Sequence, residues 1–143
     1  MSGPTPEEVM TVAAARELSD GQVVLVGVGP PNAAANLARR LQAPGCVLVY
    51  ESGAIGAKPL HLPLSIGDDD LAATADELVS VPEMFAYWIG AGRMDVGFLG
   101  AAQIDAHEVG ELAQGGGGDP RVGVGPRRGR QDGAGQVVEL VED

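Results

Sequence analysis

The residue best suited to chemistry in this sequence is Glu51, because it directly follows an apolar run at residues 46–50 that predicts a buried strand. It opens the sequence ESGAIG at residues 51–56, whose small side chains allow a ligand to approach the carboxylate closely. A carboxylate in this place is a solvated loop acid, a ribose-binding acid, or a nucleophile or general base. The position of Glu51 alone leaves these three interpretations open.

The ribose-binding interpretation can be tested on the glycines of the preceding loop. Two glycines follow an apolar run at residues 23–26, and Glu51 lies about 20 residues further on, as in dinucleotide-binding units. The third glycine of that fingerprint is replaced by Asn32, and the prolines at positions 30 and 31 lack the N–H groups that would hold a pyrophosphate. The sequence therefore disfavours a dinucleotide site.

Three apolar runs predict the strands that position these residues, at 23–26, 46–50 and 94–99. Each run is short and apolar, which is typical of strands buried on both faces of a parallel sheet. Helical segments separate the runs, and a strand–helix–strand connection of this kind is right-handed and parallel. We therefore expect an α/β fold: an open, Rossmann-like, mostly parallel sheet with flanking helices.

Capping signals predict where the helices begin. Thr5 and Ser80 each start a capping box, with proline early in the first turn and glutamate three residues after the cap. Asn32 is the expected N-cap of a helix over residues 33–41, because the two prolines before it favour a tight loop. Residues 57–75 are expected to be irregular, with a short helix near Leu71.

The carboxyl ends of the predicted strands should meet at one edge of the sheet, where open α/β proteins bind their ligands. Glu51 belongs to that edge. Backbone N–H groups beside it could hold a developing oxyanion, and the candidates are Gly29, Ser52 and Gly53, with plain turn geometry as the alternative explanation for each. Residues after the third strand are expected to line the same site: Gly100, Ala101 and Gln103.

The charge balance disfavours several classes of partner. Nine basic and 20 acidic side chains give a formal net charge of -11, which repels nucleic acid and anionic membranes. The apolar runs are too short for a membrane span, so we expect a cytoplasmic protein. One cysteine and two histidines provide no ligand pattern for a metal site, and no bound cofactor is predicted.

Several ordered blocks of the sequence resemble the beta subunit of family I CoA-transferases, especially the glutaconate and 3-oxoadipate CoA-transferase branch. The resemblance covers residues 5–105. It rests on the capping segment at 5–16, GVGPPN at 27–32, YESGAIGAKP at 50–59, LPLSIGD at 62–68 and DVGFLGAAQID at 95–105.

The resemblance implies acyl transfer, because Glu51 matches the catalytic glutamate of the family's E-x-G-x-x-G element. Coenzyme A would be a substrate, exchanged between an acyl-CoA and a free carboxylic acid through a glutamyl-CoA thioester. His61 is a further candidate for contact with CoA or substrate.

The family's site lies between two different subunits. The implied partner is therefore a CoA-transferase alpha subunit, the implied assembly is a hetero-oligomer, and the isolated chain should be inactive. The alternatives are a non-catalytic, partner-binding family member and a CoA-ester hydrolase of the same fold.

The character of the sequence changes after residue 105. Residues 106–143 are rich in glycine, arginine and proline and lack the later blocks of the family. We therefore expect a family-like domain over residues 1–105 and a divergent tail, with the C-terminal part of the fold incomplete through truncation or divergence. Within the tail, residues 137–141 predict a strand.

Overall fold

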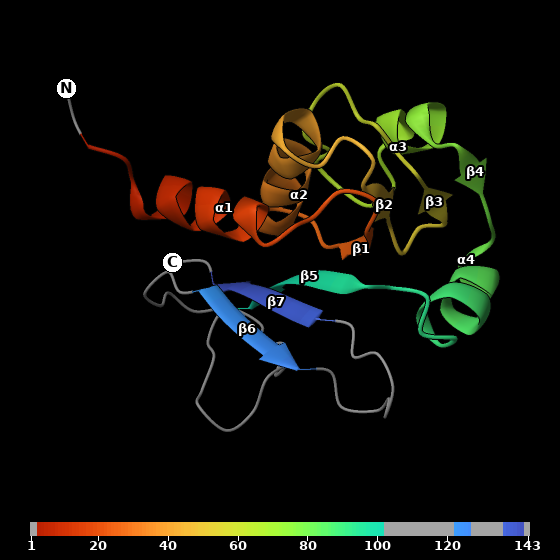
Figure 1. The fold of residues 1–143 in the computed structure, drawn as a ribbon. Helices are drawn as coiled ribbons and strands as arrows, with labels where there is room; N and C mark the ends of the chain where they lie inside the picture. Colours follow the sequence, from red (N-terminus) through yellow and green to blue (C-terminus); the bar gives the residue numbers. More distant parts are fainter. Residues whose placement is uncertain (1–2, 102–121, 127–135, 142–143) are drawn as a thin grey trace.

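A seven-stranded mixed sheet runs through the residues that the computed structural model describes, which are 3–101, 122–126 and 136–141 (Figure 1). The strand order is β4-β3-β2-β1-β5-β7-β6. The expected α/β sheet with flanking helices is confirmed, and antiparallel pairings lie on both sides of its parallel centre. That centre consists of four strands: β2 (Val47–Val49), β1 (Val23–Val26), β5 (Val96–Ala101) and β7 (Gln136–Val141).

The antiparallel strands are the part of the sheet that the sequence did not predict. β3 (Ala54–Ile55) and β4 (Glu77–Leu78) have two residues each, too few to show a period-two pattern. β6 (Val122–Pro126) lies in the glycine-rich segment, whose composition gives little apolar signal. β7 contains the expected strand at residues 137–141 and pairs in parallel with β5, so the tail adds to the same sheet. The expected domain boundary at residue 105 stays a prediction.

The capping boxes predicted at two helix starts are both confirmed. α1 (Pro6–Arg16) is capped by Thr5, whose N–H donates to the Glu8 carboxylate over 2.7 Å, while the N–H of Glu8 donates to the Thr5 hydroxyl over 3.2 Å. The same reciprocal pair at Ser80 opens a helical segment made of α4 (Val81–Glu83) and the π-helix η1 (Met84–Ile89).

α2 (Pro30–Leu41) begins earlier than the predicted residue 33, and the prediction that Asn32 is its N-cap was wrong. Gly29 occupies the N-cap position. The two prolines form the first turn, where backbone N–H groups have no helical acceptor and a missing N–H loses no bond. Asn32 is consequently turned into the protein, where its side chain is buried.

α1 and α2 pack against each other on one face of the sheet (Figure 1). They cover Val24 and Val26 of β1, and both helices contribute buried alanines to this cluster. α3 (Asp69–Thr74) is the short helix expected near Leu71, and it buries that leucine in the same cluster. None of the described helices is long and apolar enough to cross a membrane.

The opposite face of the sheet carries a smaller cluster. It contains Met84 of η1 and Met94, with Trp88 packed partly against them. Val23 and Leu25 of β1 are only half-buried on this face. The predicted burial of β1 on both faces is therefore only partly correct among the described residues, because the single short helix η1 covers this side incompletely.

β2 and β3 form a hairpin whose turn carries Glu51. The N–H of Gly53 donates to the carbonyl oxygen of Tyr50 over 3.0 Å, and the N–H of Tyr50 donates to the carbonyl oxygen of Ala54 over 2.9 Å. Gly53 has φ +105°, and a Cβ there would collide with the carbonyl oxygen of Val79. Glycine is therefore required at position 53 both by the backbone conformation of the turn and by the close approach of Val79.

We expect Gly53→Ala to destabilise the chain much more than Gly21→Ala does. Both glycines have positive φ, but a Cβ added at Gly21 meets no atom within 4 Å. Backbone strain of about 1–2 kcal/mol is common to the two substitutions, and the collision at Gly53 adds roughly 1–3 kcal/mol. Urea denaturation measures the difference. Equal losses in the free energy of unfolding would show that the hairpin accommodates a side chain.

Candidate active site

Three neighbouring parallel strands end at the same edge of the sheet, and residues at these ends or just beyond them form the candidate site. The register pairs Leu25 of β1 with Val49 of β2, and Val26 of β1 with Phe98 of β5. β1 has β2 on one side and β5 on the other, so the chain order changes direction here, which is the usual ligand position in open α/β sheets. The strands lead to Gly29, Glu51 and Gly100 on this side.

Glu51 lies in the tight turn of the β2–β3 hairpin, so the backbone on both sides of it is fixed by hydrogen bonds. Its side chain is half-buried, and its carboxylate forms no hydrogen bond or salt bridge with another described residue. A partly buried carboxylate with no partner in the described ranges is available to a ligand there, as a nucleophile or a general base must be.

The predicted oxyanion donors differ in what their backbone N–H groups do. Neither Gly29 nor Ser52 donates its N–H to a residue of the described ranges, whereas the N–H of Gly53 is taken up by Tyr50 in the turn. Gly29 has φ 81° and ψ -139°, and its carbonyl oxygen accepts the N–H of Asn32 over 3.0 Å at the start of α2. The geometry favours Gly29 and Ser52 as donors and gives Gly53 the task of shaping the turn.

The end of β5 borders this edge with small residues. Gly100 is half-buried, and a Cβ added to it would meet no atom within 4 Å, so there is space beside the strand. Ala101 is the last residue of β5. Gln103 lies outside the described residues, and its expected place in the site stays a prediction.

Sequence reasoning missed the side chain of Tyr50, the residue before Glu51. Its hydroxyl donates to Oδ1 of Asn32 over 2.7 Å, and Nδ2 of Asn36 donates to the same oxygen over 2.8 Å. Burial raises the pKa of Tyr50 to about 12, which keeps the phenol protonated as a donor. A signal was present in the sequence: two asparagines at i and i+4 on the alanine face of α2 require a buried partner.

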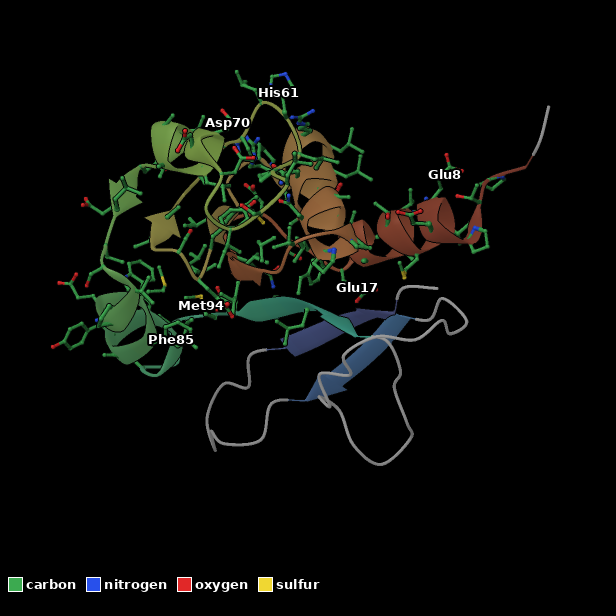
Figure 2. The ribbon with its side chains drawn as sticks, turned by 180° about the vertical axis from the view of Figure 1, so that it is seen from behind. Glu8, Glu17, His61, Asp70, Phe85 and Met94 are labelled. Carbon is green, nitrogen blue, oxygen red and sulfur yellow. The ribbon has the colours of Figure 1, made fainter. Side chains whose placement is uncertain are left out.

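His61 belongs to a loop that the structure keeps away from this edge. The guanidinium of Arg40, in the last turn of α2, donates to the carbonyl oxygen of Leu60 over 2.9 Å, whereas Gly29 caps the first turn. The rise of the helix separates its two ends by about 15 Å. Figure 2 shows His61 beside Asp70 at the outer margin of the molecule. In the described part of the chain, no group of three His, Cys, Asp or Glu side chains could hold a metal ion.

Comparison with protein families gives a match over residues 7–138 to the family described as coenzyme A transferase. The chain is 61% identical over 105 residues to the B subunit of 3-oxoadipate CoA-transferase from Pseudomonas knackmussii. It is 33% identical over 108 residues to the B subunit of glutaconate CoA-transferase from Acidaminococcus fermentans. These alignments cover 73% and 72% of this chain but 40% of each relative, so the chain spans about two fifths of the length of the curated relatives it matches.

Two solved structures share the fold. The crystal structure of glutaconate coenzyme A-transferase from Acidaminococcus fermentans matches with a TM-score of 0.61 and 34% identity, over 71% of this chain and 41% of that chain. The decarboxylase AibA/AibB matches with a TM-score of 0.61 and 30% identity, over 71% of this chain and 43% of that chain. The same fold thus carries more than one reaction, and the side chains at the site must decide between them.

We expect the stability of the chain to fall between about pH 10 and pH 12, with Tyr50 as the cause. Burial raises the pKa of Tyr50 from 10.0 to about 12. Below pH 10 the hydroxyl is protonated in the folded and the unfolded chain, so its contribution is fully present. Between these values the unfolded chain ionises first, which lowers the free energy of unfolding by up to roughly 2–3 kcal/mol.

Tyr50→Phe should flatten this part of the pH profile in urea unfolding experiments. The matched control is Tyr87→Phe, since Tyr87 is the other tyrosine of the chain and its side chain is exposed. The control should retain the wild-type slope. A Tyr50→Phe profile parallel to that of the wild type would contradict the buried, protonated phenol.

Proposed function

The chain belongs to the coenzyme A transferase family, and on that premise we propose that it is one subunit of an enzyme that moves CoA between an acyl-CoA and a free carboxylic acid. The observation that carries the proposal is the carboxylate of Glu51, half-buried and set in ESGAIG at the edge where three parallel strands end. The residue type adds what the fold alone lacks, because the same fold also occurs in a decarboxylase.

In the proposed reaction, an oxygen of the Glu51 carboxylate attacks the carbonyl carbon of the acyl-CoA thioester. The carbon–sulfur bond breaks and CoA leaves as a thiolate. The acyl group is now joined to Glu51 as a mixed anhydride. The thiolate then attacks the glutamyl carbonyl carbon, which releases the first acid as a carboxylate and leaves CoA on Glu51 as a thioester. The second acid repeats these steps in reverse, and the Glu51 carboxylate is regenerated without net gain or loss of protons or electrons.

Each attack places negative charge on a carbonyl oxygen, which the site must stabilise. We assign this task to the backbone N–H groups of Gly29 and Ser52, which donate no hydrogen bond to any of the described residues. Donors on a fixed backbone are effective because they do not have to reorient as the charge develops. Gly53 holds the turn in shape, and the residues assigned to the border of the site are Gly100, Ala101 and Gln103.

The substrates we propose are a CoA thioester and a short dicarboxylic or 3-oxo acid. The support is the pair of relatives named for 3-oxoadipate and glutaconate, which are both dicarboxylates. Coenzyme A is a substrate in this scheme, and no step passes through a bound cofactor. We place the reaction in the cytoplasm, in keeping with apolar runs that are too short to span a membrane.

We further propose that a second, different subunit docks on the loop after β3. Leu60, Leu62 and Leu64 alternate along this loop with exposed fractions of 72%, 56% and 92%. The backbone beneath them is fixed, because the N–H of Leu60 donates to Asp70 over 2.8 Å and the N–H of Leu64 donates to Asp68 over 3.2 Å. A pre-ordered row of exposed leucines is suited to a protein interface, since little entropy remains to be lost on binding.

Charge indicates what kind of partner this is. CoA and carboxylic acids are anions, whereas this chain carries a net charge of -11. A partner with basic residues would offset this charge, and a second copy of this chain would be repelled. Both curated relatives are named as B subunits, which fits a distinct alpha-type subunit in a hetero-oligomer.

We expect Glu51→Gln to abolish CoA transfer, because a neutral amide is a poor nucleophile toward a thioester. The chain would be co-expressed with the alpha subunit of the Pseudomonas knackmussii enzyme, incubated with an acyl-CoA and treated with borohydride, which reduces a glutamyl thioester to an alcohol. Mass spectrometry should locate this change at Glu51 in the wild type. The control Glu17→Gln, at an exposed position at the end of α1, should behave like the wild type.

Two other outcomes would favour the alternatives. A stable two-subunit complex in which Glu51 is never modified would indicate a non-catalytic, partner-binding subunit. Release of free CoA in the absence of an acceptor acid would indicate a CoA-ester hydrolase, because hydrolysis requires only water.

We expect the double substitution Leu62→Ser and Leu64→Ser to reduce the affinity for the same alpha subunit to one tenth or less, a change of about 1.4 kcal/mol. The fold should be unaffected, because both side chains already face solvent. The control is Val9→Ser, which changes an exposed apolar residue of α1. Sedimentation of the mixed subunits measures the affinity, and unchanged binding by the double variant would rule out this loop as the interface.

A further inference from the structure

Three buried polar side chains join the two principal loops of the candidate site. The Tyr50 hydroxyl donates to Oδ1 of Asn32, while Nδ2 of Asn36 donates to that oxygen, to the Asn32 carbonyl oxygen over 3.0 Å and to the Tyr50 hydroxyl oxygen over 3.4 Å. None of the three is more than 2% exposed. Among the described residues they form a polar island in an apolar cluster, and no step of the proposed reaction uses them.

Each end of this network is bonded to the backbone of a site loop. Tyr50 directly precedes Glu51, and its carbonyl oxygen accepts the N–H of Gly53 over 3.0 Å. Asn32 donates its own N–H to the carbonyl oxygen of Gly29 over 3.0 Å. One hydroxyl-to-amide hydrogen bond therefore connects the turn that carries Glu51 to the turn that begins α2.

A buried hydrogen bond fixes direction as well as distance. Apolar contacts between α2 and the sheet tolerate small slips, because the hydrophobic effect is not directional. A slip that broke the bond between Tyr50 and Asn32 would leave buried polar atoms without partners, which is strongly unfavourable in an apolar core. Asn36 adds to this restraint by holding Oδ1 of Asn32 in place.

We propose that Tyr50 and Asn32 are positioning residues for the acyl transfer proposed above, on which this inference rests. Their hydrogen bond holds the Glu51 hairpin and the Gly29 turn at one relative position. The Glu51 carboxylate and the backbone N–H donors at the two strand ends then meet the same substrate carbonyl group. Neither side chain touches the substrate.

Tyr50→Phe tests this role in the two-subunit enzyme, because it removes one oxygen and keeps the ring that packs in the core. We expect kcat to fall about 10- to 100-fold, the effect of a small misplacement of reacting groups. KM for the acyl-CoA should change less than about twofold, because the lost restraint acts on the reacting geometry. Tyr87→Phe is the matched control and should keep the wild-type kcat.

Asn32→Ala should reproduce the loss in kcat, and the double variant should lose less than the two single losses combined, because both substitutions break the bond between Tyr50 and Asn32. Hydrogen exchange of the assembled enzyme gives a readout independent of activity. Asn32→Ala should accelerate exchange in the hairpin at residues 50–55, and Tyr50→Phe should accelerate it at residues 28–36. If the side chains had a purely local packing role, each substitution would accelerate hydrogen exchange only in its own segment.

The possible failures are distinguishable. A wild-type enzyme that forms no glutamyl-CoA overturns the proposed function. A wild-type enzyme that forms it no faster than Tyr50→Phe does overturns only the positioning role. The same conclusion follows if each substitution accelerates hydrogen exchange solely in its own segment.

Discussion

The candidate site depends on the parallel pairing of β1 with both β2 and β5. Parallel neighbours end on the same side of a sheet, so segments from distant parts of the chain meet there without any bond between the loops themselves. The pairing also requires each connection to cross over the sheet, and α2 makes the first crossover. Its buried alanines let the helix lie close to β1, and that close fit brings its first turn beside the carboxyl end of β2.

At the end of β2 the chain reverses instead of leaving the sheet. Residues 50–53 close a turn into β3, and the carboxylate of Glu51 is therefore presented from a hydrogen-bonded hairpin. A carboxylate whose backbone is held in this way has already lost part of its conformational freedom on folding, so less entropy remains to be lost on binding a ligand. The turn tolerates no side chain at position 53, because the carbonyl oxygen of Val79, directly after β4, lies against Gly53.

The fold sets the location of the chemistry, whereas individual side chains set its nature. One related structure is a CoA-transferase and another is a decarboxylase, with equal TM-scores to this chain. A carboxylate at position 51 suits covalent transfer of an acyl group because it can form an anhydride and then a thioester. The buried phenol of Tyr50 stays neutral beside it, so a structural hydrogen bond and the candidate carboxylate lie at adjacent positions.

The sequence by itself determined the capped helix starts and the parallel strands, and it singled out Glu51 as the candidate reactive group. The capping boxes at Thr5 and Ser80 and the apolar run of β1 act through near neighbours, so they are recognisable without a fold. The start of α2 was mispredicted because proline has opposite effects at the first turn and within a helix. Only the tertiary structure decided that Glu51 lies in a hairpin and that Tyr50 binds Asn32. Those two side chains are 18 positions apart, and their hydrogen bond exists only once α2 has packed against the sheet.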